Sequence, residues 1–180
     1  MRKAAIILIG LGILVVVASQ TYLSWQTEPE GPVVANKTTL RNTESGSIAG
    51  FIDKLGARSW QGIPYAEPPV GQLRWRAPQP PIASQTTIEA LQPGAICPQF
   101  ASLLSGADEQ TPSGQIAGNE DCLYLNIWSP PNAAKLPVML WIHGGGNTIG
   151  HGGSYNGAAL ATQRNVVIVT INYRLGIFGW

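Results

Sequence analysis

The stretch PVMLWIHGGG, residues 137–146, sets the fold of this chain. Its first part is a nearly continuous apolar run, which is typical of a strand buried on both faces of a parallel sheet. Three consecutive glycines follow at the carboxyl end of that strand. Ligands of open α/β sheets bind beyond the carboxyl ends of the strands, so we expect the glycines to border a site.

Glycine removes the side chain that would keep a ligand away from the backbone, and it accepts positive φ. Consecutive N–H groups can then point at one spot, which suits a developing oxyanion or a phosphate. The phosphate-binding patterns GxxxxGK(S/T) and helix-opening GxGxxG are missing from the sequence. His143 with the three glycines instead matches the HGGG pattern of oxyanion loops in esterases. A plain turn ahead of a helix is the structural alternative.

Further runs predict the rest of the fold. LYLNIW (123–128) and NVVIVTINY (165–173) are strand-like, and residues 156–164 predict a crossover helix with Ala158, Leu160 and Ala161 on its inward face. Upstream, the β-prone runs 47–53 and 57–64 predict a hairpin. We therefore expect an α/β fold in which a small antiparallel hairpin leads into a mainly parallel sheet.

The N-terminus differs in character from the rest of the chain. Arg2 and Lys3 precede an uncharged apolar run at 4–18, which is short for a spanning helix of about 20 residues and suits a signal peptide. We expect residues 1–23 to be a signal peptide or a signal anchor, with a buried core helix as the third possibility. Residues 24–45 are polar and predict a linker. The protein is then exported, and is periplasmic, secreted or attached to a membrane by this segment.

Composition excludes some partners. Net charge is +1 with 12% charged residues and no basic run, so no nucleic-acid partner is expected. Cys97 and Cys122 lie between the hairpin and the glycines, and an exported pair is expected to oxidise, with two buried thiols as the alternative. Two Cys and two distant His lack the spacing of metal ligands, so no metal site is expected.

Four stretches carry a family resemblance. They are, in chain order, GIPYAEPPVGQLRWRAPQP (62–80), NEDCLYLNIWSP (119–130), VMLWIHGGG (138–146) and NVVIVTINYRLGIFGW (165–180). Together they resemble the N-terminal part of the type-B carboxylesterase family, which includes cholinesterases and neuroligins. The resemblance implies an α/β-hydrolase fold, hydrolysis of a small carboxylic ester through an acyl-enzyme, and no cofactor.

The resemblance also implies roles for single residues. Gly145 and Gly146 match the family's N–H donors to the oxyanion, and His143 and Gly144 match the support of that loop. Asn147 stands where animal members often carry an aromatic residue, so their substrate preference is not carried over.

Two pairs match structural features of the family. Cys97 and Cys122 match its first disulfide, in the contexts CPQ and EDC. Arg74 and Glu120 match a buried ion pair, although the residues alone would indicate two surface charges.

A serine esterase also needs a nucleophile, a base and an acid, with the serine in a GxSxG elbow. No such elbow occurs in the 180 residues, and GGSYN around Ser154 lacks the last glycine. His143 and His151 are disfavoured as the base, and Asp108 and Asp121 as the acid.

We therefore expect residues 46–180 to be the N-terminal portion of the hydrolase domain, truncated before the nucleophile elbow. The 180-residue chain alone is then inactive, while the intact protein is a carboxylesterase of the EC 3.1.1 class. The alternatives are an inactive, neuroligin-like adhesion protein and a non-functional gene fragment.

Overall fold

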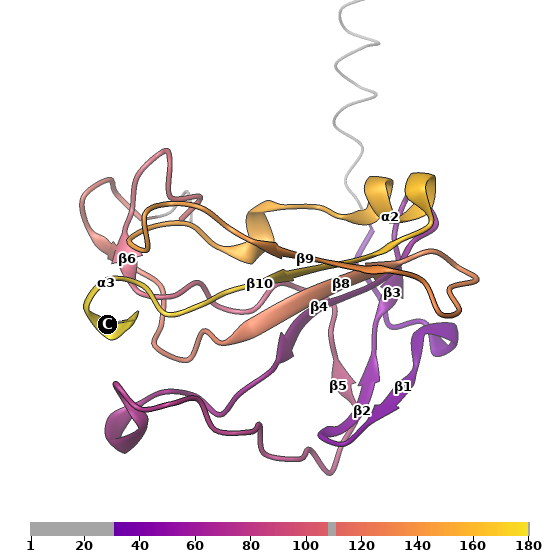
Figure 1. The fold of residues 1–180 in the computed structure, drawn as a ribbon, viewed down its shortest axis with the longest axis horizontal. Helices are drawn as coiled ribbons and strands as arrows, with labels where there is room; N and C mark the ends of the chain where they lie inside the picture. Colours follow the sequence, from indigo (N-terminus) through magenta and orange to yellow (C-terminus); the bar gives the residue numbers. More distant parts are fainter. Residues whose placement is uncertain (1–30, 108–110, 180) are drawn as a thin grey trace, which may run out of the picture. The chain divides into compact units, whose positions relative to one another are not determined.

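The computed structural model describes residues 31–107 and 111–179, and its main feature is a mixed sheet with the strand order β3-β4-β8-β10-β9 (Figure 1). These strands are β3 (Phe51–Ile52), β4 (Arg58–Pro64), β8 (Tyr124–Ser129), β10 (Val167–Ile171) and β9 (Val138–Ile142). In this sheet β9 and β10 are parallel, whereas the other neighbours pair antiparallel. The α/β class is confirmed, but the described sheet is mixed rather than mainly parallel. Apolar runs report burial and not strand direction, which is why the sequence pattern missed this.

The predicted hairpin is confirmed by β3 and β4, which place Phe51 opposite Ser59 and Ile52 opposite Arg58. Gly50 separates β3 from the preceding strand. A Cβ on Gly50 would overlap the carbonyl oxygen of Ser59 and lie 2.7 Å from Cδ1 of Trp60. The chain can therefore cross β4 this closely only because residue 50 has no side chain.

Helix α2 (Ala158–Arg164) connects β9 to the adjacent parallel strand β10, as the crossover prediction requires. Ala158 and Ala161 are buried, but Leu160 is 41% exposed, so its predicted inward position was wrong. A helix turns about 100° per residue, which places Leu160 on the face opposite Ala158. The helix ends at Arg164, and its C-cap Asn165 takes the left-handed conformation with φ 53°.

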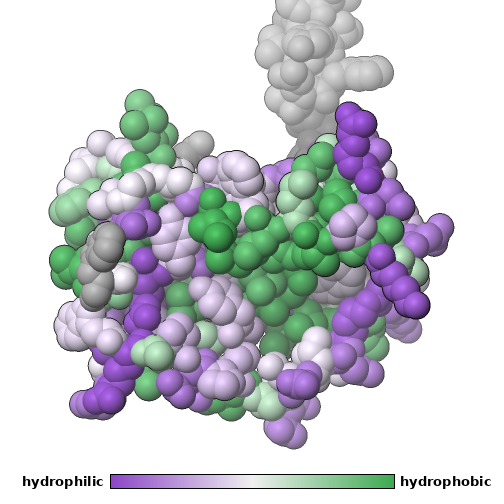
Figure 2. All heavy atoms as spheres, in the orientation of Figure 1, coloured by the Kyte–Doolittle hydropathy of each residue, from purple (hydrophilic) through white to green (hydrophobic). Residues whose placement is uncertain are grey.

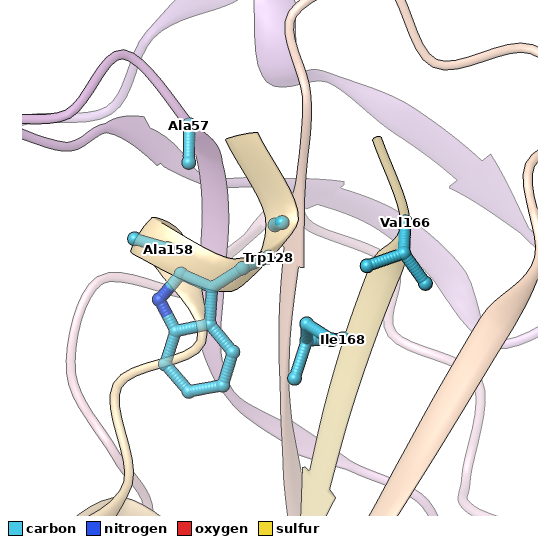
Figure 3. Packing of buried hydrophobic residues seen from close by; sticks show 6 residues of the cluster. Ala57, Trp128, Ala158, Val166 and Ile168 are labelled. Carbon is cyan, nitrogen blue, oxygen red and sulfur yellow. The ribbon is translucent and has the colours of Figure 1, made fainter. Parts of the chain in front are cut away.

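The core beneath α2 is formed by six buried residues, several of them shown in Figure 3: Ala57, Trp128, Ala158, Ala161, Val166 and Ile168. Trp128 of β8 is the largest of them and is almost fully buried. The small alanines of α2 let the helix lie close to this indole. A Cβ on Gly157, just before the helix, would come within 2.6 Å of Cγ2 of Ile168. Tight packing of helix on sheet therefore depends on small residues at the start of α2.

A second, three-stranded sheet lies on the other side of the main sheet from α2 (Figure 1). Its order is β1-β2-β5, with β1 (Arg41–Thr43), β2 (Gly46–Ala49) and β5 (Ile88–Glu89).

The segment predicted as a linker up to residue 45 therefore folds from η1 (Lys37–Thr39) onward, which corrects that boundary. Contacts of the buried residue Thr39 explain why this segment is folded. Its hydroxyl accepts a hydrogen bond from Gly50 N, and its carbonyl accepts one from Nε1 of Trp60. The polar composition of the segment suggested a linker. The contacts that order it are made with Gly50 and Trp60, which lie outside the segment, so its composition does not reveal them.

The short elements complete the described chain. They are η2 (Gly71–Leu73), β6 (Gln99–Phe100), β7 (Ile116–Ala117), η3 (Gly152–Ser154) and α3 (Gly176–Gly179). β6 and β7 pair antiparallel within the disulfide-closed loop between Cys97 and Cys122.

Strand β9 forms one edge of the described sheet, and all five of its residues are exposed. They are Val138, Met139, Leu140, Trp141 and Ile142, at 46 to 65% exposure. Figure 2 shows a band of hydrophobic side chains across the place that β9 occupies in Figure 1. The prediction that 137–142 is buried on both faces is therefore wrong for the described residues, since β10 inserts between β8 and β9 and leaves β9 outermost.

The predicted leader, residues 1–23, lies outside the described residues. Within the described ranges, the structure has no helix of the length and hydrophobicity that a membrane crossing requires.

Candidate active site

The glycine loop follows β9 directly, at the end of the strand where parallel strands of α/β sheets present their ligands. His143 is the first residue after the strand, and the loop runs to Gly150. Gly145, Gly146 and Asn147 have φ of 119°, 61° and 59°. A Cβ on Gly145 would overlap the carbonyl oxygen of Ile149. The loop conformation thus requires glycine at 145 and favours it at 146, while Asn147 is one of the few residue types that tolerate this region.

The loop holds its carbonyl groups on its inner side. The carbonyl oxygen of Gly145 accepts hydrogen bonds from Thr148 N at 3.1 Å, Ile149 N at 3.2 Å and Thr148 Oγ1 at 3.0 Å. The carbonyl oxygen of Gly144 lies 2.9 Å from Nδ1 of His143. Because a carbonyl can only accept, Nδ1 carries the proton of this imidazole.

These carbonyls fix the direction of the next N–H groups. In a trans peptide, the C=O of one residue and the N–H of the next point in opposite directions. The described residues contain no cis peptide. The N–H groups of Gly145 and Gly146 therefore point away from the inside of the loop, and within residues 31–107 and 111–179 neither donates a hydrogen bond to the protein.

His143 is a buried support of this loop. Its ring stacks on that of Tyr173 with centroids 4.4 Å apart, and the Tyr173 hydroxyl donates to the His143 carbonyl oxygen at 2.7 Å. Burial lowers the pKa of His143, and a positive charge on His151 would lower it further against the raising effect of the Gly144 carbonyl. The imidazole is therefore neutral at pH 7 and acts as a fixed donor to Gly144.

Tyr173 is a residue of this site that the sequence did not single out. It follows β10 and reaches His143 across the neighbouring strand end. Burial raises its pKa, so the hydroxyl keeps the proton that it donates. The sequence signal that could have found Tyr173 is its position at the end of the strand-like run 165–173. The sequence did not show which residue its side chain contacts.

Cys97 and Cys122 form the predicted disulfide, with Cα atoms 5.0 Å apart and both residues buried. Arg74 and Glu120 are also in contact, through Nε to Oε2 and through Nη2 to Oε1 at 2.5 Å. Their side chains are 40% and 20% exposed, so this pair is only partly covered and not buried as the resemblance implied. The aromatic ring of Phe178 lies over the Arg74 guanidinium on one side, at 6.0 Å.

Ser154 and His151 meet but do not form a nucleophile and base. Nε2 of His151 lies 2.9 Å from Oγ of Ser154 and 2.7 Å from the carbonyl oxygen of Gly106. The carbonyl requires a proton on Nε2, so this nitrogen cannot take the proton of the serine. This geometry agrees with the exclusion of both residues as catalytic groups.

Of the two candidate acids, Asp121 contacts the side chain of Tyr124 in strand β8. Burial, together with the hydrogen bond and the electrostatic effect of Asp121, raises the pKa of Tyr124 to about 12. Asp108 lies outside the described residues. In the described part of the chain, no group of three or more His, Cys, Asp or Glu side chains could hold a metal ion.

Comparison with known proteins identifies the lineage. A sequence model described as the carboxylesterase family matches residues 37–180. The para-nitrobenzyl esterase of Bacillus subtilis (strain 168) is 45% identical over 141 residues, which cover 77% of this chain and 28% of that protein. The fumonisin B1 esterase of Sphingopyxis macrogoltabida is 44% identical over 146 residues, covering 78% of this chain and 25% of that protein.

Solved structures agree with the sequence relatives. A structure of a PNB esterase superposes with a TM-score of 0.69 at 43% identity, covering 77% of this chain and 28% of that one. A carboxylesterase from Geobacillus stearothermophilus gives 0.66 at 41% identity, over 79% of this chain and 27% of that one. The chain spans about a quarter of the length of the proteins that it matches. On this sequence and structural similarity, the chain belongs to the carboxylesterase family.

Proposed function

We propose that the intact protein hydrolyses carboxylic esters and that the N–H groups of Gly145 and Gly146 form part of its oxyanion hole. The observation that carries this proposal is the orientation of two adjacent peptides. Their carbonyls are held by His143, Thr148 and Ile149, which leaves two N–H groups without a protein partner in the described residues. Membership of the carboxylesterase family supports the same reaction.

The proposed reaction is acyl transfer to a serine. A serine hydroxyl attacks the ester carbonyl while a histidine takes its proton, and the tetrahedral oxyanion receives hydrogen bonds from Gly145 and Gly146. The histidine then protonates the leaving alcohol, and water releases the acid from the acyl-enzyme. In this fold a third N–H comes from the residue after the serine. We place the serine, histidine and acid in the part of the intact protein that residues 1–180 do not include.

Two glycine substitutions test the role of the loop. Gly146 and Gly71 have φ of 61° and 54°, and a Cβ on either residue meets no atom within 4 Å. Alanine at either position therefore costs a similar ~1 kcal/mol of backbone strain. We expect Gly146→Ala to lower kcat/KM for p-nitrophenyl acetate by about 10-fold or more, because the donor shifts, and Gly71→Ala to leave it unchanged.

The assay uses the protein as its gene encodes it in full. Equal activity of the two variants would remove the oxyanion role from Gly146. A folded full-length product that hydrolyses no short-chain p-nitrophenyl ester would contradict the esterase proposal and favour the adhesion alternative.

We also propose that residues 1–23 direct export, either as a cleaved signal or as an anchor. The buried Cys97–Cys122 disulfide supports this proposal, because disulfides persist in oxidising compartments. N-terminal sequencing of the protein from fractionated cells tests it. Recovery from the cytosol with Met1 intact would contradict it.

A further inference from the structure

Gln99 makes an unusual set of contacts with the oxyanion loop. Its Oε1 accepts a hydrogen bond from Gly150 N at 2.7 Å, and its Nε2 donates to Gly150 O at 3.1 Å. Nε2 also donates to the carbonyl oxygen of Cys97 at 3.1 Å. The side chain is buried, with 4% exposure. One amide therefore binds both backbone groups of one residue that lies 51 positions away.

The orientation of this amide is fixed by its partners. A flipped amide would set its NH2 group against Gly150 N–H and its oxygen against two carbonyl oxygens. Both hydrogens of Nε2 have acceptors in the observed orientation, and Oε1 accepts from Gly150 N, so each polar atom of the buried amide has a partner.

Gly150 in turn bears on the part of the loop that directs the N–H groups. Its φ is 104°, and a Cβ at this position would lie 2.7 Å from Nδ1 of His143 and 2.8 Å from the carbonyl oxygen of Gly144. The preceding residue, Ile149, donates its N–H to the carbonyl oxygen of Gly145. The backbone of residues 149–150 therefore packs against His143 and the Gly144 carbonyl, and it donates a hydrogen bond to the Gly145 carbonyl.

We propose that Gln99 is a positioning residue of the oxyanion hole, which acts on Gly145 and Gly146 by clamping Gly150. This inference rests on the proposed esterase function. It gives the disulfide-closed loop a role in catalysis, because Cys97 both closes that loop and accepts one of the three hydrogen bonds of Gln99. Loss of the clamp lets Gly150 move and weakens hydrogen bonds that the oxyanion receives, while the ester ground state is bound as before.

The first test is Gln99→Leu in the full-length gene product, with Gln115→Leu as the matched control. Gln115 lies in the same disulfide-closed loop, but its side chain is exposed. We expect Gln99→Leu to lower kcat for p-nitrophenyl acetate by about 10-fold or more with KM changed less than about threefold. The reason is that the weakened hydrogen bonds to the oxyanion are made in the transition state and not in the ground state. Gln115→Leu keeps both constants. Thermal unfolding of each variant ensures that the rates refer to folded protein.

Gln99→Glu adds a pH readout that a merely structural role would not move. An ionised carboxylate accepts from Gly150 N but repels the carbonyl oxygens of Gly150 and Cys97. A protonated carboxyl restores one donor and one acceptor, and burial raises its pKa above the usual value of about 4.3. The activity of Gln99→Glu relative to wild type is therefore expected to rise as the pH falls toward that pKa, whereas the ratio for Gln99→Leu stays constant.

Two outcomes overturn the inference. One is a kcat for Gln99→Leu within twofold of wild type, and the other is a loss that Gln115→Leu shares. If the wild-type product hydrolyses no ester, the proposed function fails separately. Amide hydrogen exchange then decides on Gln99: the variant should speed exchange in residues 143–150 by about 10-fold and leave β4 and β8 unchanged. Unchanged exchange in 143–150 would reject the clamp.

Discussion

At the scale of single residues, this site is built from side chains that hold backbone groups in place. His143 donates to the Gly144 carbonyl, Tyr173 holds the His143 backbone, and Gln99 holds Gly150. The groups proposed to meet the substrate are N–H groups, which every residue except proline carries. The residues that determine this loop conformation are therefore glycines, which adopt the required φ values, and a few buried side chains that donate hydrogen bonds.

The neutral imidazole of His143 leads to a prediction on pH. Its pKa is lowered from 6.5 by burial, so the unfolded chain binds more protons than the folded one between the two pKa values. The free energy of unfolding is then at its full value above pH 6.5 and falls as the pH drops through the folded pKa. The variant His143→Asn keeps a side-chain N–H for Gly144 but does not titrate. We expect its unfolding free energy to fall less steeply than that of wild type between about pH 7.5 and 5.

Urea denaturation at a series of pH values measures this difference. Parallel curves for wild type and His143→Asn would show that His143 is not buried as a neutral ring.

At the scale of elements, β9 combines two properties. It carries the glycine loop at its carboxyl end, and it forms an exposed apolar edge of the described sheet. An apolar edge strand with unpaired backbone groups is a template for association between chains. The same strand thus supports the candidate site and is the part of the described sheet at which the 180-residue chain is expected to associate with a second chain.

We predict that Leu140→Lys reduces self-association of the 180-residue chain, because a charge on an edge strand opposes pairing with a second chain. Leu55→Lys is the matched control, since Leu55 is similarly exposed (57% against 52% for Leu140) in the β3–β4 turn. Sedimentation velocity should show a smaller share of oligomer for Leu140→Lys and no change for Leu55→Lys. An equal response of the two variants would mean that general charge, and not the edge of β9, governs association.

At the scale of the whole molecule, the disulfide connects the segment that contains Gln99 to the central strand of the described sheet. Cys97 lies two residues before the Gln99 clamp, and Cys122 lies two residues before β8, at the centre of the sheet. Both cysteines pack in one buried cluster with Ala66, Leu123 and Leu175. The covalent bond therefore connects the segment that carries Gln99 to the sheet that carries the glycine loop.

Replacement of both cysteines by alanine should lower the unfolding free energy of the full-length product by about 3 to 4 kcal/mol, from the entropy of closing a loop of this length. Urea denaturation under non-reducing conditions measures the change. A loss below about 1 kcal/mol would show that the unfolded chain gains little freedom without the bond.

Local patterns account for what could be predicted from the sequence. Apolar runs located β8, β9 and β10 to within two residues, and the alanine-rich segment located α2. The four stretches 62–80, 119–130, 138–146 and 165–180 led to the family and to the disulfide. These features are encoded by residues that are close together in the chain, which is why periodicity and motif spacing suffice for them.

Only the tertiary structure decided the rest. The place of β10 between β8 and β9, and hence the exposure of β9, depends on which strands pair and not on how apolar they are. The folding of residues 37–45 depends on contacts of Thr39 with Gly50 and Trp60. The contacts around the glycine loop depend on Tyr173 and Gln99, which lie 30 and 51 positions from His143 and Gly150. A hydrogen bond between residues so far apart leaves no periodicity in the sequence, because its geometry exists only once the sheet has brought both ends together.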